Sequence, residues 1–472
     1  MELWQLPATR LAAGIRDREF SATEVARASL DRIAAVNPTV NALVELRPEE
    51  TLAEAARADA AVAAGAPLGP LHGVPVSTKI NTAEKGKLAS QGLSALVNQY
   101  APGDEGCISA LRAAGPVFLG RSNAPAFSMR WFSTNDPHGR TLNPYDAART
   151  PGGSSGGAAA GVATGMTPIA QGNDIGGSIR YPAACCGVVG VRPTVGLVSN
   201  WMPPLDIELE GPLTFQTWAV QGPLARTVED ARLALHAMVS PDLRDPFGIP
   251  AAPPSTAGRP PAKVKVVRDV GLAKSLPAMD AGVDRAAAWL AEAGHQVEEI
   301  DLPLLGEAAR LWSLLLFEDM RPMLPQMRAM GDEATRRGLV HCYEAAAELW
   351  GAEPGVTAYI QGWARRATLI TRLQELLGDD TVLLTPASAE PAFEQDADYL
   401  DGARARSLFA AQWPMIAVPV LGFPAVSVPT GQDTGLPIGV QLIGGRFTED
   451  LLLDTAAAIE AHSGFGTPID PR

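Results

Sequence analysis

Two short glycine-rich segments contain serines whose surroundings suit nucleophilic chemistry. Residues 151–157 read PGGSSGG, and residues 174–180 read DIGGSIR. Glycine leaves backbone N–H groups open to a close ligand, so a serine placed there can attack a carbonyl while those groups hold the oxyanion. Upstream, residues 73–79 end at Lys79, which can accept a proton when its amine is neutral. These segments predict acyl transfer through a serine nucleophile.

Residues 152–157 also fit other patterns, but less well. A flexible linker would not run directly into the alanine-rich, helix-forming residues 158–163. The pattern G-x-S-x-G would make Ser155 the nucleophile and His462 the base of an α/β-hydrolase-type esterase. That nucleophile elbow requires an apolar strand before the serine, and residues 143–150 are polar and turn-like. We retain the esterase as an alternative. A phosphate-binding loop is excluded because no Gly-Lys-Ser/Thr follows the glycines.

The composition narrows the partners that the chain can bind. A formal charge of −14 leaves no surplus of cations for phosphates, so nucleic acid and anionic membranes are disfavoured and a small-molecule substrate is favoured. Four prolines interrupt the apolar residues 413–430, which disfavours a membrane helix. The first residues lack a secretory pattern, so we expect a cytoplasmic protein. The four cysteines and six histidines are scattered, which predicts reduced thiols, no metal and no cofactor.

Alternating apolar runs and helical patterns predict an α/β protein whose serine motifs lie on connecting turns. A capping box at residues 21–24 opens an amphipathic helix that we expect to stop at Asn37-Pro38. Residues 303–375 are mostly helical in pattern, and strands return after them. We predict four regions: an N-terminal helical region (1–65), a core with the catalytic residues (66–240), an insertion or helical lobe beside the substrate pocket (241–375) and the C-terminal part of the core (376–472).

The order and spacing of these segments resemble the amidase signature family, whose members are serine hydrolases with a Ser–cis-Ser–Lys triad. The resemblance covers nearly the whole chain. It implies an α/β fold with a central mixed β-sheet of many strands covered by helices on both faces. It also implies a cofactor-independent enzyme, monomeric or homodimeric, that cleaves C–N bonds of small amides. Further blocks that resemble the family lie at residues 143–144, 186–194, 222–226, 384–386 and 435–441.

The resemblance assigns roles to the candidate catalytic residues. Ser178 becomes the nucleophile, Ser154 the bridging serine next to a cis peptide, and Lys79 the base. Because an ammonium group cannot accept a proton, we expect Lys79 to be buried, without a close carboxylate partner. The other predicted site residues are the oxyanion donors Ile175, Gly176, Gly177 and Ser178, and the supporting residues Ser155, Asp174 and Arg180.

Two departures from the family pattern bear on the substrate. Ile80 follows Lys79 where most relatives have aspartate, and residues 195–201 lack the arginines that many relatives have. The missing arginines argue against a glutamine site and hence against the alternative of a glutaminase (A-type) subunit of a tRNA-dependent amidotransferase. Residues 311–350 can supply further pocket walls.

Aromatic and methionine side chains near the serine motifs favour apolar or aryl amides, with carbamates (urethanes) and esters as further substrates. Core packing accounts for the same side chains about equally well. The candidate substrate-binding residues are Phe127, Met129, Trp131, Phe132, Trp201, Met202 and Trp218.

Overall fold

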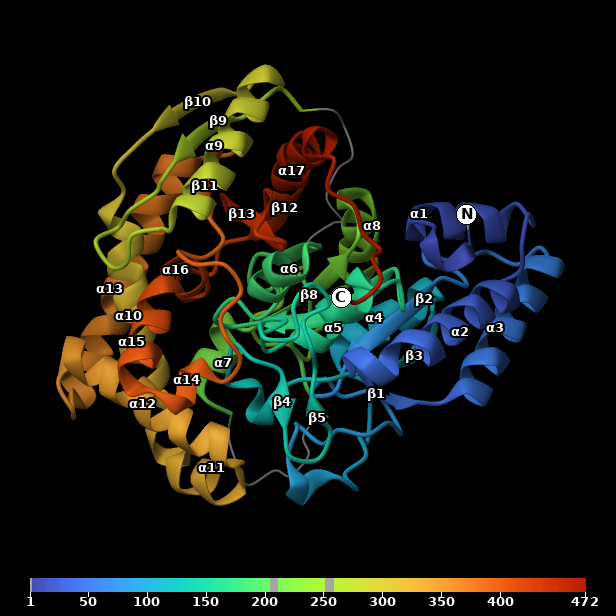
Figure 1. Cartoon of the computed structure of the whole chain (residues 1–472), viewed down its shortest axis with the longest axis horizontal. Helices are drawn as coiled ribbons and strands as arrows, with labels where there is room; N and C mark the ends of the chain where they lie inside the picture. The colour runs from blue at the N-terminus through green and yellow to red at the C-terminus, as the bar shows by residue number, and fades with distance from the viewer. Residues whose placement is uncertain (1, 204–210, 251–258) are drawn as a thin grey trace.

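The computed structural model describes residues 2–203, 211–250 and 259–472 (Figure 1). Within these ranges the chain forms an eleven-stranded mixed sheet in the order β1-β3-β2-β6-β8-β7-β12-β13-β11-β9-β10, and a two-stranded ribbon of β4 and β5. The strands are β1 (Leu43–Leu46), β2 (Pro75–Lys79), β3 (Val117–Ser122), β4 (Thr134–Asn135), β5 (Gly139–Arg140), β6 (Ile169–Asp174), β7 (Val189–Arg192), β8 (Val220–Ala225), β9 (Lys263–Val266), β10 (Gln296–Glu299), β11 (Thr381–Pro386), β12 (Ala425–Asp433) and β13 (Leu436–Gly444).

Helices cover both faces of this sheet, as the alternation of buried side chains along one strand shows. In β11, Val382 and Leu384 belong to one apolar cluster, and Leu383 between them belongs to another. The first cluster includes residues of α1 (Ala8–Arg16), α4 (Gly106–Ala114), α8 (Val228–Met238), α9 (Pro277–Glu292) and α17 (Glu449–Ser463). The second includes residues of α10 (Pro303–Met320), α13 (Gly355–Leu377) and α16 (Trp413–Leu421). Helices α5 and α6 cover the second face farther along the sheet. The predicted α/β fold with a central mixed sheet is therefore confirmed.

The N-terminal helices lie at one edge of the molecule (Figure 1). Ser21 caps α2 (Ala22–Val40), and the predicted capping box with Glu24 is present. The predicted stop at Asn37-Pro38 is wrong by one turn. The helix continues to Val40, and Asn41 ends it in the left-handed conformation with its N–H donating to the carbonyl of Asn37. Two further helices in this region are α1 (Ala8–Arg16) and α3 (Pro48–Ala63).

The serine and lysine motifs lie together at one end of the central strands of the sheet. Strands β2 and β6 are parallel neighbours, so their carboxyl ends lie together, with Lys79 at the end of β2 and Asp174 at the end of β6. Each glycine motif leads into a helix, which was predicted for residues 151–157 but not for residues 174–180. The remaining helices of this half are α4 (Gly106–Ala114), α5 (Gly156–Ala163), α6 (Arg180–Cys186), α7 (Leu213–Trp218) and α8 (Val228–Met238).

Residues 259–377 form an extension of the main sheet and then a helical lobe. Strands β9 and β10 pair in parallel and extend the main sheet, with α9 between them in the chain. Helices α10 to α13 then form a helical lobe on the opposite side of the molecule from α1 to α3 (Figure 1). No helix in the described ranges is long and apolar enough to cross a membrane. The helices from here on are α9 (Pro277–Glu292), α10 (Pro303–Met320), α11 (Leu324–Met330), α12 (Glu333–Trp350), α13 (Gly355–Leu377), α14 (Ala397–Leu400), α15 (Gly402–Ala411), α16 (Trp413–Leu421) and α17 (Glu449–Ser463).

Candidate active site

Lys79 is fully buried at the end of β2, as expected. Its Nζ lies 2.7 Å from Ser154 Oγ and 2.7 Å from Asn173 Oδ1. Among the described residues, no carboxylate forms an ion pair with it. Burial lowers the pKa of Lys79 well below its ordinary value, and the more distant charge of Asp174 opposes this only in part. Burial therefore favours the neutral amine, which is the form that can accept a proton.

Ser154 receives the hydrogen bond from Lys79 and is almost completely buried. The peptide bond between Gly153 and Ser154 is cis, as the family resemblance implied. A side chain at position 153 would not fit, because a Cβ atom there would lie 2.4 Å from the carbonyl oxygen of Arg130 and 2.4 Å from the amide nitrogen of Phe132. Glycine is thus required for the close backbone approach that fixes Ser154 beside Lys79.

Ser178 lies on the loop between β6 and α6 and lines a cavity. The N–H of Ser155 donates to the carbonyl of Ser178 at 3.2 Å, which joins the two glycine motifs directly. Lys79, Ser154 and Ser178 therefore come from three separate segments that meet at one edge of the sheet, as their predicted roles require.

A buried ionic cluster fixes the loop that contains Ser178. Arg180 donates from Nε and Nη2 to the two carboxylate oxygens of Asp174, both at 2.9 Å, and both side chains are completely buried. Arg192 donates to the backbone carbonyl of Asp174 at 2.6 Å. Burial alone would raise the pKa of Asp174, but Arg180 and Arg192 outweigh it and lower that pKa to about 2. The predicted pair of Asp174 and Arg180 is an internal clamp, not a surface ion pair.

The backbone of the loop offers three free N–H groups, not four. The N–H of Gly177 donates to Asp174 Oδ1 at 2.9 Å, so it is engaged by the clamp. Gly177 is therefore the one member of the predicted donor set whose N–H already has an acceptor. The N–H groups of Ile175, Gly176 and Ser178 have no acceptor in the described part of the chain and can bind an oxyanion.

The esterase alternative based on Ser155 does not match the geometry. Ser155 is completely buried, and its hydroxyl donates to the carbonyl of Asn173 at 3.4 Å. His462, the base in that alternative, belongs to the end of α17, where its ring stacks on Trp289 and its Nδ1–H donates to the carbonyl of Ala458 at 2.8 Å. Ser155 has no histidine partner in the described ranges, which leaves its predicted supporting role.

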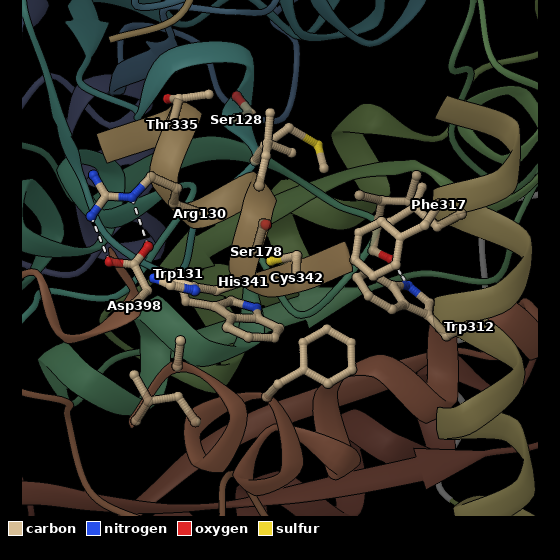
Figure 2. Close-up of a pocket in the computed structure, with 18 residues that line it drawn as sticks. Ser128, Arg130, Trp131, Ser178, Trp312, Phe317, Thr335, His341, Cys342 and Asp398 are labelled. Atoms are coloured by element: carbon tan, nitrogen blue, oxygen red, sulfur yellow. Dashed lines mark hydrogen bonds and ion pairs between the residues drawn. The ribbon is translucent and has the colours of Figure 1, made fainter. Parts of the chain in front are cut away.

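An aromatic cavity opens beside Ser178, with an empty volume of about 850 Å³ that includes its mouth. Trp312, Leu316 and Phe317 on α10 and Phe409 on α15 form much of its wall (Figure 2). Trp312 and Phe317 lie on one side of Ser178, and the ion pair of Arg130 with Asp398 lies on the other (Figure 2). The remaining lining residues are Ser128, Met129, Trp131, Ile175, Thr335, Gly338, Leu339, His341, Cys342, Ala405 and Leu408.

Two of the seven candidate substrate residues, Met129 and Trp131, line this cavity. The other five do not line this cavity, and their part in substrate binding stays a prediction. Phe132 and Trp218 are completely buried in the apolar core, since each fills space between packed elements. Phe127 packs against the apolar cluster of the helical lobe, Trp201 lies beneath the guanidinium of Arg244 at 3.6 Å, and Met202 is 54% exposed.

Sequence analysis missed several residues that the structure brings into the site. Asn173 accepts from Lys79 and donates to Asn81 Oδ1 at 3.0 Å, so the two asparagines hold the amine. Asn173 directly precedes Asp174, and Asn81 lies two residues after Lys79. Short polar side chains so near a lysine that was expected to be buried were the signal that could have identified them. Trp312 and Phe317 lie in residues 311–350, the segment expected to supply pocket walls, but no single position there stood out. Phe409 lies outside that segment, and apolar helix positions of this kind usually serve packing alone.

The fold and the site define a hydrolase of the amidase class. The sequence model of the Amidase family matches residues 24–453, so this chain belongs to the amidase signature family. It is an amidase, an enzyme that acts on carbon–nitrogen bonds of amides.

Three relatives illustrate the range of the family. The chain is 37% identical to an indoleacetamide hydrolase of Bradyrhizobium diazoefficiens, over 98% of this chain and 87% of the relative. It is 34% identical to the A-type subunit of the glutamyl-tRNA(Gln) amidotransferase of Carboxydothermus hydrogenoformans, over 98% of this chain and 99% of the relative. A bacterial aryl acylamidase of known structure superimposes with a TM-score of 0.83 at 27% identity, covering 98% of this chain and 97% of that one.

Proposed function

We propose that this chain is a free-standing amidase that hydrolyses apolar or aryl amides through an acyl-enzyme on Ser178. The observation that carries the proposal is the aromatic cavity, because it opens directly at Ser178. Its walls of Trp131, Trp312, Phe317 and Phe409 offer flat apolar surface to an aryl or indole ring. Carbamates and esters present the same type of carbonyl and are further substrates of the proposed site.

In the proposed mechanism, neutral Lys79 accepts the proton of Ser154 while Ser154 accepts the proton of Ser178. The oxygen of Ser178 forms a bond to the amide carbon, and the carbonyl oxygen becomes an oxyanion. The free N–H groups of Ile175, Gly176 and Ser178 then stabilise that charge, and removing one such donor costs about 3 kcal/mol of barrier. The carbon–nitrogen bond breaks as the proton returns through Ser154 to the leaving amine.

Water completes the reaction in the second half of the cycle. It attacks the acyl-enzyme carbonyl, and its proton passes through Ser154 to Lys79. The bond between the acyl carbon and Ser178 breaks, the serine recovers its proton, and the acid product leaves. Every step uses side chains and backbone groups of the site, and the same lysine serves both halves of the reaction.

The glutaminase alternative fits the cavity less well. Glutamine has an ammonium and a carboxylate that both need charged partners. Arg130, which lines the cavity, already donates from Nε and Nη2 to the carboxylate of Asp398, each at 2.7 Å. The wall beside Ser178 is aromatic. Relatives named as amidotransferase subunits match this chain over most of its length, but the cavity of this chain favours an apolar substrate.

Release of amine from a small substrate panel tests the proposal. The panel contains a primary aliphatic amide, an anilide, an aryl carbamate and glutamine, with Ser178→Ala as the blank. We expect serine-dependent turnover of the anilide, with kcat/KM at least tenfold above that of glutamine. Turnover of glutamine alone would replace the proposal with the amidotransferase alternative. Undiminished turnover by Ser178→Ala would remove Ser178 as the nucleophile.

A further inference from the structure

Two tryptophans that line the aromatic cavity also donate hydrogen bonds to backbone carbonyls of residues 175–178, the oxyanion loop, which contains the proposed oxyanion donors. The indole N–H of Trp312 donates to the carbonyl of Ile175 at 2.8 Å, and that of Trp131 donates to the carbonyl of Gly176 at 2.8 Å. Trp312 comes from α10 in the helical lobe, more than a hundred residues from the loop in sequence. Figure 2 shows its indole N–H directed at the loop carbonyl beside the cavity.

The two hydrogen bonds restrain different peptide units. In a trans peptide the C=O of one residue and the N–H of the next point in opposite directions within one plane. The bond from Trp312 to Ile175 therefore sets the direction of the N–H of Gly176, which has no acceptor in the described part of the chain. The bond from Trp131 acts on the next unit, whose N–H, that of Gly177, is already held by Asp174.

The ring of Trp312 also presses on the same peptide. A Cβ atom built on Gly176 would lie 2.9 Å from Cζ2 of Trp312, so the ring packs directly against the glycine backbone. Phe317 meets the Trp312 ring edge-on, with centroids 5.8 Å apart, and Phe409 lies 5.9 Å away on a tilted plane. Only 5% of Trp312 is exposed. These contacts leave the indole little freedom to move.

We propose that Trp312 is a positioning residue, which aims the N–H of Gly176 at the oxyanion formed on Ser178. The proposal rests on the proposed function, since it requires the acyl transfer described above. It separates two roles of the indole: the ring is part of the cavity wall, and the N–H fixes an oxyanion donor. Trp131 makes a similar bond, but its peptide unit is fixed from both ends. The structure therefore assigns the larger catalytic effect to Trp312.

The substitution Trp312→Phe keeps an aromatic wall and removes the N–H. We expect kcat to fall by roughly ten- to a hundredfold, less than for complete loss of an oxyanion donor. The fall should be the same for an anilide and for a small aliphatic amide that does not reach the wall. We expect KM to change less than about threefold for either. Trp131→Phe should lower kcat by less than about threefold, because Asp174 still holds its peptide unit.

Trp350→Phe is the matched control. The Trp350 indole also donates to a backbone carbonyl, that of Arg310 at 3.0 Å, but it lies outside the cavity lining and the oxyanion loop. We expect kcat and KM of this variant to match those of the wild type. If Trp312→Phe folds poorly by circular dichroism, 3-benzothienylalanine at position 312 keeps the indole shape and replaces the N–H by sulfur. The same fall in kcat is expected.

The proposal is overturned if Trp312→Phe keeps the wild-type kcat on the small amide, or if it loses activity only on the anilide through KM. Either result would make Trp312 a wall residue alone. Ser178→Ala is assayed beside these variants, because it tests the proposed function and not the role of Trp312. An active Ser178→Ala enzyme would remove the proposed function itself. An inactive one, together with unaffected Trp312→Phe, would remove only the role of Trp312.

Discussion

The catalytic centre and the aromatic cavity are built in different ways, although they meet at Ser178. In the catalytic centre, directional hydrogen bonds and ion pairs fix Lys79, Ser154 and Asp174, all of which are essentially inaccessible to solvent. In the cavity, packed apolar side chains from α10, α12 and α15 form most of the wall, although the indole N–H of Trp312 on α10 also donates to the loop of Ser178. The difference indicates that changes in the first region alter the rate of the chemical step, whereas changes in the second alter which substrate binds, except at Trp312, whose N–H acts on the loop of Ser178.

The largest effect is expected from loss of the base. Lys79→Ala removes the group that accepts the proton from Ser154, and general acid–base catalysis contributes about 10²- to 10⁴-fold. We expect kcat to fall by that factor with little change in KM for an anilide, measured by steady-state kinetics. Lys87→Ala is the control, since Lys87 forms a surface ion pair with Glu50. Comparable losses in both variants would contradict the assignment of Lys79.

Removing one carboxylate from each region should lower the free energy of unfolding by different amounts. Asp174→Asn leaves Arg180 and Arg192 buried without their anion, so we expect the free energy of unfolding to fall by about 3–5 kcal/mol in urea denaturation. Asp398→Asn, at the cavity, should cost only about 1–3 kcal/mol, because Arg130 retains Asp396 at 3.6 Å. An equal cost for both would contradict the idea that the catalytic centre is the more tightly fixed region.

The pH dependence should respond to a new charge beside Lys79. Asn173→Asp places a carboxylate where the amide oxygen now accepts from Lys79. An opposite charge favours the ammonium form, so the pKa of Lys79 rises and the acid limb of kcat/KM moves to higher pH, by about one to three units. Asn173→Ala should not move the limb in that direction. An acid limb that stays in place in Asn173→Asp would show that Lys79 does not control the rate.

The smallest effect is expected from shortening one apolar side chain of the cavity wall. Leu339→Ala on α12 enlarges the cavity, and loss of apolar contact should lower kcat/KM for an unsubstituted anilide by about three- to tenfold, through KM. A small aliphatic amide should be unaffected, and a bulkier para-substituted anilide should improve. Leu349→Ala, also on α12 but 44% exposed, is the matched control. A fall in kcat on the small amide would contradict the separation of the two regions.

Sequence patterns predicted the catalytic centre because its chemistry is local. Residues 151–157 and 174–180 each combine glycines with a serine, and their functional groups lie within a few residues of one another. The family resemblance supplied what the local pattern lacked, the pairing of Ser154 with Lys79 across 75 residues. The bond from the Gly177 N–H to Asp174 could not be predicted, since the sequence alone does not determine the direction of a backbone amide.

The cavity was less predictable because its walls are assembled by tertiary packing. Trp218 and Phe132 looked like pocket residues but fill the apolar core, and Phe317 and Phe409 looked like ordinary core residues but line the cavity. An apolar side chain has the same sequence signature in either place. Trp312, Leu316 and Phe317, which line the cavity, do lie in residues 311–350, the segment expected to supply pocket walls.

Covalent labelling of the nucleophile tests the central claim most directly. The wild-type enzyme and Ser178→Ala, Ser155→Ala and Lys79→Ala variants are treated with a fluorophosphonate, and the modified peptide is mapped by mass spectrometry. Our account predicts one label, on Ser178, in the wild type and in Ser155→Ala, much slower labelling in Lys79→Ala and none in Ser178→Ala. A label on Ser154 or Ser155 of the wild-type enzyme, or labelling that persists in Ser178→Ala, would contradict it.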